Sequence, residues 1–489
     1  MGGAMTGTTT VRRAGAWIAG QPVSGSATLP VRDPWTDELV AEVALADPEH
    51  VEQALQLAHE AAGSLLAVPA HRRADALRQA ATGLLERMDE VAATITRESG
   101  KPITWSRAEV QRAALTFRWG AEEAVRWSGE LQRLDSEPGG DGRLALQRRF
   151  PRGPVLGITP FNFPVNLAAH KIAPALAVGA PIVLKPAPKT PLSALLLGEI
   201  LTDCGLPAGA FSVLTVDDEV AAGLVADPRM PVVSFTGSGP VGWAIRNAVP
   251  RKHVTLELGG NAGVLICPDW SSDADLRQAA RRIATGANAQ GGQSCISVQR
   301  VLVDRTVYER FLPVLVEEVE QLVVGDPWSP ATTVGPLINR AAAQRIGEWV
   351  TAAVAGGARV LTGGTVTDAL VSPTVLVDAP ADAQVCQDEA FGPVLTVAAV
   401  DGVDEGLRAL DDSRFGLQAG IFTHDIQTAF RAHRELEVGG VIVGDIPTFR
   451  AEQMPYGGVK ESGIGREGVR AAMEDYTESR LLVLSGVSL

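Results

Sequence analysis

Residues 232–242 read Val-Val-Ser-Phe-Thr-Gly-Ser-Gly-Pro-Val-Gly, an apolar run followed by three closely spaced glycines. The apolar part predicts a buried strand, and the glycines open the helix that follows it. In such a unit the backbone N–H groups and the dipole at the start of the helix can face a bound phosphate, as in dinucleotide-binding proteins. A glycine-rich turn without a ligand fits the same residues equally well. The stretch therefore predicts a strand–turn–helix unit and leaves its ligand open.

Short apolar strands alternate with helical patterns on both sides of this stretch, and a second such series begins after Glu257. Strands joined by helices pair in parallel and are buried on both faces, so the alternation predicts a doubly wound α/β fold. The predicted strands are 154–158, 181–184, 211–214, 232–235, 264–267, 298–303 and 394–400; the predicted helices are 49–66, 72–88, 106–127, 165–178, 191–204, 216–226, 274–289, 307–324 and 340–355. Residues 143–150 and 480–487 also predict strands, which pair with each other or with another subunit.

The composition bounds the class of protein. A chain of 489 residues is too long for one core and predicts two or three domains. The net charge of −14 argues against nucleic acid or an anionic membrane surface as the main partner. The most apolar stretch, 154–184, contains prolines, a histidine and lysine, so it does not predict a membrane span. We therefore expect a cytoplasmic protein.

One of the four cysteines lies in a glycine-rich turn, Gly291-Gly292-Gln293-Ser294-Cys295. The four are widely spaced without a Cys-x-x-Cys pair, which predicts neither a metal site nor a disulfide framework. The glycines leave room for a substrate to approach the Cys295 sulfur. Glu257 could activate water against a thioester formed there, which predicts covalent acyl chemistry. Glu257 also lies where a dinucleotide fingerprint expects its acidic ribose ligand, so two roles compete for it.

Three other segments each contain a polar residue that could serve in a site or have only a structural or surface role. Asn162, in Pro160-Phe161-Asn162-Phe163-Pro164, could donate to a developing oxyanion or simply bond its own backbone. Lys185 follows a predicted strand, where ribose or phosphate groups often lie, or is a solvated loop lysine. Glu389, in Glu-Ala-Phe-Gly-Pro, is a ligand carboxylate or a surface residue.

Seven segments, in order along essentially the whole chain, resemble the aldehyde dehydrogenase superfamily. They are Pro160–Pro164, Lys185-Pro186, Phe235–Ser238, Glu257–Gly260, Gly292–Cys295, Glu389–Pro393 and Pro455–Lys460. Agreement by chance at all seven is implausible. The string Gln-Ser-Cys-Ile-Ser-Val-Gln-Arg at 293–300 is most similar to the branch with lactaldehyde, phosphonoacetaldehyde and non-phosphorylating glyceraldehyde-phosphate dehydrogenases.

The resemblance implies roles for individual residues. It makes Cys295 the nucleophile, Glu257 the general base and Asn162, with the backbone N–H of Cys295, the oxyanion hole; Lys171 matches a family lysine near the active centre. The cofactor would be NAD or NADP, and no metal is implied. The residues implied to contact the cofactor are Thr159, Pro160, Lys185, Pro188, Gly237, Ser238, Gly242, Glu389 and Phe391.

The resemblance also implies a Rossmann-type cofactor domain, an α/β catalytic domain and a small bridging β element that forms homodimers or homotetramers. The expected boundaries are 1–129, 152–253 and 463–479 for the cofactor domain, 254–462 for the catalytic domain, and 130–151 and 480–489 for the bridging element.

Two departures from the family pattern bear on cofactor and substrate. Members restricted to NAD usually carry Glu three residues after the Lys185 position, where this chain has Pro188, so NADP use becomes possible without excluding NAD. Relatives that act on phosphorylated aldehydes often have Arg where this chain has Ser294. Arg450 could still clamp an anionic substrate, or be a surface residue paired with Glu452. Phe163 is a further candidate for contact with the substrate.

The sequence thus predicts NAD(P)-dependent oxidation of a small hydroxylated or anionic aldehyde to a carboxylate, of the lactaldehyde, phosphonate or semialdehyde type. The alternatives are a dehydrogenase that releases acyl-CoA and a catalytically silent member kept as a binding or structural protein. The presence of Glu257 argues against the first of these, and the complete set of Cys295, Glu257 and Asn162 argues against the second.

Overall fold

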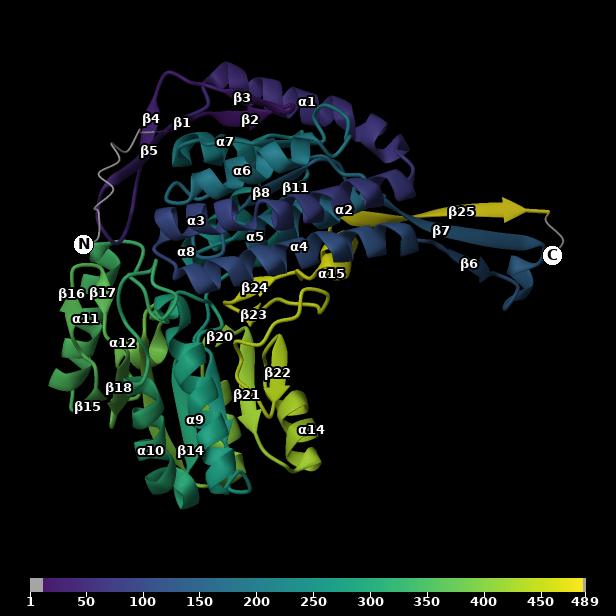
Figure 1. Ribbon diagram of the computed structural model, residues 1–489. Helices are drawn as coiled ribbons and strands as arrows, with labels where there is room; N and C mark the ends of the chain where they lie inside the picture. The colour runs from purple at the N-terminus through teal and green to yellow at the C-terminus, as the bar shows by residue number, and fades with distance from the viewer. Residues whose placement is uncertain (1–11, 487–489) are drawn as a thin grey trace.

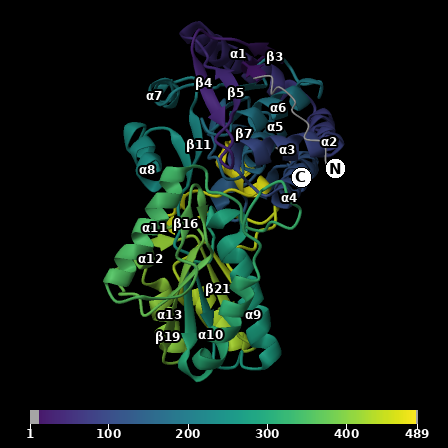
Figure 2. The same cartoon turned by 60° about the vertical axis from the view of Figure 1, so that its left-hand side comes forward.

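The stretch at 232–242 folds as strand β11 (Val232–Thr236) followed by helix α8 (Gly239–Ala248), as predicted. The computed structural model describes residues 12–486. β11 lies inside an eight-stranded sheet with the order β24-β12-β11-β8-β9-β10-β2-β3, the upper lobe of Figures 1 and 2. Its strands are β24 (Gly463–Ile464), β12 (His253–Glu257), β8 (Val155–Ile158), β9 (Ile182–Lys185), β10 (Phe211–Val213), β2 (Ala16–Ile18) and β3 (Gln21–Val23).

The five strands from β12 to β10 are parallel, and the chain order reverses between β8 and β11. From β8 the chain continues to β9 and β10 on one side, then returns to β11 and β12 on the other. Loops leaving the carboxyl ends of two such strands diverge and open a crevice for a ligand. The loops that begin at Thr159 and Gly237 lie at this point.

Helix α5 (Asn166–Val178) joins β8 to β9 and is buried along its whole length. Helices α2 (Ala70–Glu86) and α4 (Ile103–Arg126) pack outside it, which explains why its sequence is apolar on all sides. The other helices of this lobe are α1 (Pro48–Ala67), α3 (Met88–Ser99), α6 (Pro191–Thr202), α7 (Asp218–Ala226) and α15 (Val469–Asp475).

A seven-stranded sheet with the order β15-β18-β19-β14-β13-β21-β22 forms the second lobe, parallel except at β15. Its strands are β15 (Arg359–Thr362), β18 (Thr374–Val377), β19 (Val394–Val400), β14 (Arg300–Asp304), β13 (Gly263–Ile266), β21 (Gln418–Phe422) and β22 (Gly440–Val443). Its helices are α9 (Asp273–Asn288), α10 (Arg305–Glu320), α11 (Arg340–Ala355), α12 (Gln384–Gln387), α13 (Gly402–Asp411) and α14 (Ile426–Glu435).

An antiparallel arm projects from the two lobes (Figure 1). It consists of β6 (Glu130–Arg133), β7 (Arg143–Pro151) and β25 (Thr477–Ser485). β7 and β25 pair along their whole length, with Arg480 opposite Arg148, so the two strands predicted at 143–150 and 480–487 do pair with each other. Val487, the last residue of that prediction, lies outside the described residues.

The predicted α/β fold is confirmed. The sequence analysis did not predict helices α3, α13 and α14, nor several short strands. The predicted strand at 298–303 begins only at Arg300. The N-terminal strands were not predicted, because each has only three to six residues, and the place of β2 in the large sheet depends on a distant partner: Ile18 lies opposite Ser212 of β10. Small sheets complete the fold: β1 (Arg12–Ala14), β5 (Leu39–Ala44) and β4 (Thr28–Arg32); β16 (Val366–Thr367) and β17 (Leu370–Val371); β20 (Phe415–Gly416) and β23 (Val459–Lys460). Within residues 12–486, no helix is both long and apolar enough to cross a bilayer.

Candidate active site

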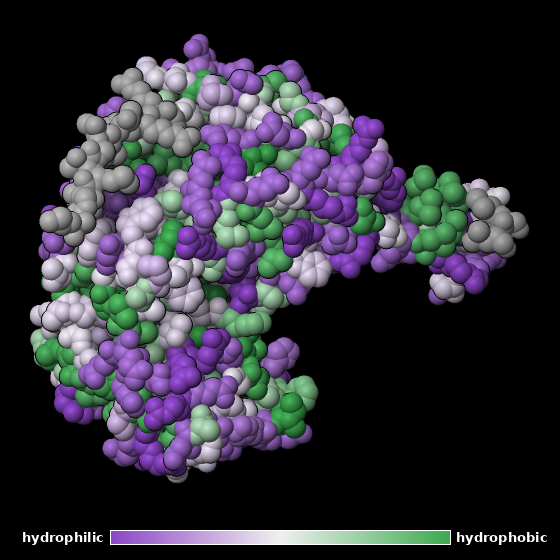
Figure 3. Space-filling view, viewed as in Figure 1, coloured by the Kyte–Doolittle hydropathy of each residue, from purple (hydrophilic) through white to green (hydrophobic). Residues whose placement is uncertain are grey.

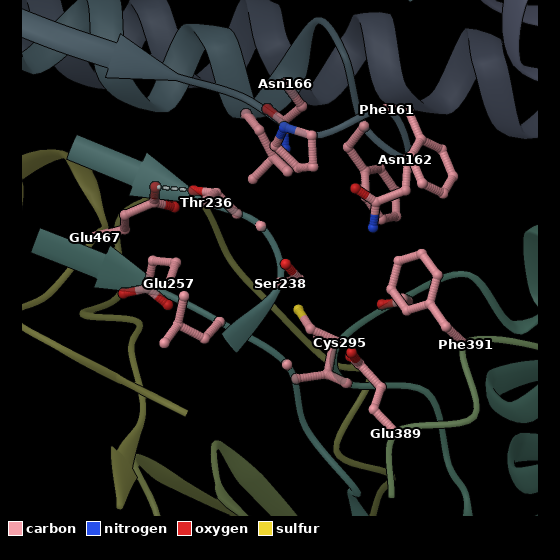
Figure 4. A pocket seen from close by; sticks show the side chains of 18 of the residues that line it. Phe161, Asn162, Asn166, Thr236, Ser238, Glu257, Cys295, Glu389, Phe391 and Glu467 are labelled. Atoms are coloured by element: carbon pink, nitrogen blue, oxygen red, sulfur yellow. Dashed lines mark hydrogen bonds between the residues drawn. The ribbon is translucent and has the colours of Figure 1, made fainter. Parts of the chain in front are cut away.

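A cavity of about 430 Å³ lies between the two large sheets and brings together Cys295, Glu257 and Asn162, whereas Lys171 does not line it (Figure 4). Asn162 and Glu257 come from the carboxyl ends of β8 and β12 in the first sheet. Cys295 comes from the loop before β14 in the second sheet. The carboxyl edge of one sheet therefore faces the amino edge of the other, and residues far apart in the sequence share one wall.

Cys295 follows a tight glycine turn. Gly291 and Gly292 have φ of 66° and 68°. A Cβ on Gly292 would lie 2.3 Å from the carbonyl oxygen of Gly392, so this position accepts only glycine. Of the four cysteines, Cys295 alone lines the cavity. Burial raises the pKa of its thiol to about 12, so it is a thiol in this structure.

Asn162 is buried on the opposite side of the cavity, and Figure 4 shows its amide directed into the same space as the sulfur. Its Nδ2 donates to the carbonyl oxygen of Gln293 at 2.9 Å, while its Oδ1 has no partner. The bond to Gln293 ties the Asn162 loop to the Cys295 loop. One amide N–H remains available to a ligand in the cavity.

The Asn162 loop is fixed from behind by a buried ion pair. Glu109 accepts hydrogen bonds from the backbone N–H groups of Val165 and Asn166 at 2.9 and 3.1 Å, at the start of α5. Lys101 neutralises Glu109, and both side chains are buried. A carboxylate at a helix N-terminus satisfies donors that the helix itself cannot, so this pair holds the loop in one place.

Glu257 is buried, and among the described residues 12–486 neither of its carboxylate oxygens has a hydrogen-bond partner. Burial, together with the nearby charge of Glu467, raises its pKa well above the ordinary value. A Cβ on Gly457 would lie 2.7 Å from Glu257 Oε1, so the glycine turn at 457 makes room for this carboxylate. A buried carboxylate with a raised pKa and an open cavity before it suits a general base.

Glu467 lies beside Glu257 in the cavity wall but is fully paired (Figure 4). Lys171 Nζ lies 2.9 Å from its Oε1, Arg450 Nη2 lies 3.3 Å from its Oε2, and Thr236 donates to Oε1 at 3.2 Å. These cations hold the pKa of Glu467 well below its usual range. Lys171 thus reaches the cavity only through Glu467 and Thr236.

Arg450 lines the cavity and is almost completely buried, so the surface alternative is wrong. Its guanidinium lies 3.9 Å from the centre of the Tyr456 ring, and its Nε has no partner. The alternative pairing with Glu452 is also wrong. Glu452 instead pairs with Arg112 at 2.5 Å and His170 at 2.6 Å, because its side chain turns toward α4 and α5.

The sequence analysis missed several cavity residues, above all Arg112 and Tyr456. Arg112 had a detectable signal. Glu109, Arg112 and Thr116 form a polar stripe at helical spacing on the inward face of α4, where apolar residues are expected. The two other substrate candidates, Ser294 and Phe163, both line the cavity, and Phe163 lies 5.9 Å from the Arg112 guanidinium.

A second cavity of about 500 Å³ shares Ser238, Gly259 and Glu389 with the first and extends along the start of α8. Glu389 accepts from the backbone N–H of Gly260 at 3.1 Å, and burial raises its pKa to about 7. Phe391 packs edge to face on Phe161, with ring centroids 5.8 Å apart. Across the two neighbouring cavities, a helix N-terminus, a carboxylate and an aromatic pair suit a nucleotide cofactor.

The remaining predicted cofactor residues divide into two groups. Pro160 and Gly237 line the first cavity, and the buried Thr159 Oγ1 nearby has no partner, as expected for an atom that a ligand completes. Lys185, Pro188 and Gly242 line neither cavity. Gly242 instead allows α8 to approach Leu258, 2.4 Å from where its Cβ would lie. Lys185 ends β9 with its Nζ 3.4 Å from Asp218.

The chain matches the aldehyde dehydrogenase family over residues 21–482 and belongs to that family. It is an oxidoreductase that acts on an aldehyde with NAD or NADP.

Among its relatives is 3-sulfolactaldehyde dehydrogenase of Priestia megaterium, 41% identical over 98% of this chain and 100% of the relative. Lactaldehyde dehydrogenase of Methanococcus maripaludis is 34% identical over 97% of this chain and 99% of the relative. Among solved structures, aldehyde dehydrogenase 21 from Physcomitrella patens in complex with the reaction product succinate superposes with a TM-score of 0.95 at 42% identity, covering 98% of this chain and 99% of that one.

Proposed function

We propose that this enzyme oxidises a small aldehyde that carries a second, acidic group, and that it releases the product as a free acid. The observation that carries the proposal is that Arg450 and Arg112 line the same cavity as Cys295. The unpartnered Nε of Arg450 is free to bind an anion. Arginine recognises carboxylates, sulfonates and phosphates alike through its planar set of donors.

The relatives support an acidic substrate of three or four carbons. One is named for 3-sulfolactaldehyde, which bears a sulfonate, and one solved structure holds succinate, a dicarboxylate product. Ser294 stands where relatives acting on phosphorylated aldehydes often have Arg, which favours a carboxylate or sulfonate over a phosphate. A hydroxylated aldehyde such as that of the lactaldehyde dehydrogenases is compatible with the same cavity.

In the proposed reaction the Cys295 thiolate attacks the aldehyde carbon and forms a thiohemiacetal. The free N–H of the Asn162 amide and the backbone N–H of Cys295 hold its oxyanion, and such donors contribute roughly 3–4 kcal/mol. The nicotinamide cofactor, when bound, accepts the hydride from the thiohemiacetal carbon, and a thioester remains on Cys295. Glu257 then takes a proton from water, which attacks the thioester and releases the acid from Cys295. Its unpartnered oxygens favour hydrolysis over transfer to CoA.

The test compares 4-oxobutanoate with butanal, which share a four-carbon chain and differ in the acidic group. We expect Arg450→Ala to raise KM for 4-oxobutanoate selectively, by roughly ten- to a hundredfold, the equivalent of a charge-assisted hydrogen bond. Arg305→Ala, which removes an exposed arginine paired with Asp401, is the matched control and should change neither KM. Cys295→Ala should lose oxidation of both aldehydes while still binding the cofactor. An equal effect of Arg450→Ala on the two aldehydes would contradict the acidic substrate, and turnover without Cys295 would contradict the nucleophile.

We also propose that the enzyme is a homodimer or homotetramer held together by the arm. Leu131 of β6 and four successive residues of β25 are exposed, and Figure 3 shows apolar surface on the arm, at the right. The four are Leu481, Leu482, Val483 and Leu484. Exposed apolar strands of this kind usually pack against another chain.

We further propose that the chain divides into a cofactor domain, a catalytic domain and this bridging element, with the boundaries given above. The four free cysteines support a cytoplasmic location.

A further inference from the structure

Tyr456 places its phenol oxygen 3.0 Å from the Cys295 sulfur, although the two residues are 161 positions apart. Within residues 12–486, neither atom has another hydrogen-bond partner. The contact is therefore exclusive on both sides, and it lies in the cavity where the aldehyde must bind.

The position of the phenol is fixed by the protein and not by a ligand. The backbone of Tyr456 exchanges two hydrogen bonds with Glu467, at 2.9 and 2.6 Å. Its buried ring packs with Ile296 and Leu417 and carries the Arg450 guanidinium on its face. The oxygen is thus pre-organised beside the sulfur before any substrate enters.

A thiolate at Cys295 is costly without a donor. Burial disfavours its charge, and the nearby carboxylates of Glu389 and Glu257 repel it, while the charge of Arg450 offsets part of this without contacting the sulfur. The Tyr456 phenol is the one side-chain donor in hydrogen-bond contact with this sulfur within the described residues. Burial and the neighbouring sulfur raise the pKa of Tyr456 well above its ordinary value, so the phenol keeps its proton and can only donate to a thiolate.

We propose that Tyr456 is a positioning residue, which holds the Cys295 sulfur in place and stabilises its thiolate by donating a hydrogen bond. This inference rests on the proposed role of Cys295 as the nucleophile. Tyr456 transfers no proton and no bond breaks at its oxygen. Only the charge of the acceptor changes, from thiol to thiolate and then to the neutral sulfur of the thiohemiacetal.

The role has a signature that a merely structural tyrosine lacks. A donor stabilises the thiolate, so it lowers the pH at which the thiolate forms, and it also makes that thiolate a weaker nucleophile. Removal of the phenol oxygen should therefore slow the reaction of Cys295 at neutral pH and leave it equal or faster once the thiol is fully ionised.

The experiment measures the rate of alkylation of Cys295 by iodoacetamide as a function of pH, with the modified peptide identified by mass spectrometry. In Tyr456→Phe we expect the rate near pH 7.5 to fall about ten- to a hundredfold, because the whole profile moves to higher pH. Tyr308→Phe is the matched control, because Tyr308 is a half-buried tyrosine on α10, outside the cavity. A profile for Tyr456→Phe that coincides with the wild type, or lies at lower pH, would overturn the proposal.

A second measurement does not depend on the folding of that variant. The chain has only three tyrosines, so replacing all of them with 3-fluorotyrosine is a limited change. Fluorination makes the phenol a stronger donor, and the alkylation profile should move to lower pH. The same replacement in Tyr456→Phe should have no such effect. An unmoved profile in the fluorinated wild type would overturn the proposal even if Tyr456→Phe failed to fold.

The outcome for Tyr456 is separable from that for the proposed function. If alkylation of Cys295 left aldehyde oxidation intact, Cys295 would not be the nucleophile, and the inference would fall with it. If alkylation abolished oxidation but the pH profile were the same with and without the Tyr456 phenol, the role of Cys295 as nucleophile would be supported and the positioning role of Tyr456 would be contradicted.

Discussion

Glu257 and Glu467 lie side by side in one wall of the cavity, equally buried, and differ only in their partners. Glu467 is held by Lys171, Arg450 and Thr236, and its pKa is lowered. Glu257 has no partner at either oxygen, and its pKa is raised. Burial alone therefore does not decide the charge of a carboxylate, since the cations around it can reverse the direction of the shift.

The contrast separates the side chains that hold the cavity wall in place from the polar groups that are open to a ligand. An unpartnered buried polar group costs free energy of folding, so it persists where a ligand or a water molecule completes it during function. Asn162 Oδ1, Thr159 Oγ1 and both oxygens of Glu257 are such atoms. The ion pairs of Glu467 with Lys171 and Arg450 hold the wall in place, while Arg450 Nε has no partner within residues 12–486 and is left for the substrate anion of the proposed function.

Removing the charge of Glu467 should have the largest effect on the free energy of unfolding. Glu467→Gln leaves Lys171 and Arg450 buried without their counter-charge, and we expect the free energy of unfolding to fall by about 3–5 kcal/mol. Urea titration of the wild type and the variant at one protein concentration would measure this. Glu461→Gln is the control, because Glu461 forms an exposed ion pair with Arg414 and should contribute at most about 1 kcal/mol.

The pH dependence of this difference has a definite sign. The pKa of Glu467 is lowered on folding, so its stabilisation is complete above the ordinary value of 4.5 and is lost as the pH falls toward the lowered value. The gap between the wild type and Glu467→Gln should therefore be full at pH 7 and narrow below about pH 4.5. A gap that stays constant through this range would mean that the charge of Glu467 is not what stabilises the wall.

Removing the charge of Glu257 should change the free energy of unfolding by less, and should raise it. The pKa of Glu257 is raised on folding, so the cost of its charge is absent below the ordinary value of 4.5 and grows as the pH rises. Glu257→Gln removes that charge. We expect the variant to match the wild type near pH 5 and to exceed its free energy of unfolding by about 1–3 kcal/mol at pH 8.

The same variant tests the role of Glu257 in the reaction. If Glu257 acts after hydride transfer, Glu257→Gln should still produce a burst of reduced cofactor near one equivalent per active site, followed by turnover slowed by about 10²–10⁴-fold. Rapid-mixing absorbance at the reduced nicotinamide band would show both phases. A folded variant without a burst would place Glu257 earlier in the mechanism.

The sequence predicted the parts of this site that local patterns encode. The glycine turn before Cys295, the strand that ends at Glu257 and the loop around Asn162 are each short segments with their own signal, and the cavity contains all three. Local spacing failed for side-chain pairing: Glu452 lies two residues from Arg450 but pairs across the fold with Arg112 and His170.

Long-range contacts explain the other omissions. The contact between Tyr456 and Cys295 joins two residues 161 positions apart, which no single segment records. The same holds for the place of β2 in the large sheet, since it pairs there with β10, almost two hundred residues away. A local sequence pattern predicts an element well when contacts within the segment form it. The prediction is poor when the element depends on pairing with a distant segment.

The smallest expected effect concerns a carboxylate that this chain lacks. Pro188 is exposed in the loop after β9, close in sequence to Lys185, whose only ion-pair partner within residues 12–486 is the exposed Asp218 at 3.4 Å. Pro188→Glu should restore repulsion against a 2′-phosphate, and we expect the ratio of kcat/KM for NADP to that for NAD to fall by roughly threefold to tenfold, as for a solvent-exposed charge. Pro188→Gln, of similar size and without charge, should leave the ratio nearly unchanged. Because an exposed interaction is screened, the effect of Pro188→Glu should also shrink as salt is added, unlike the effect of Glu467→Gln. A ratio that does not respond to the added charge would mean that residue 188 does not face the cofactor ribose.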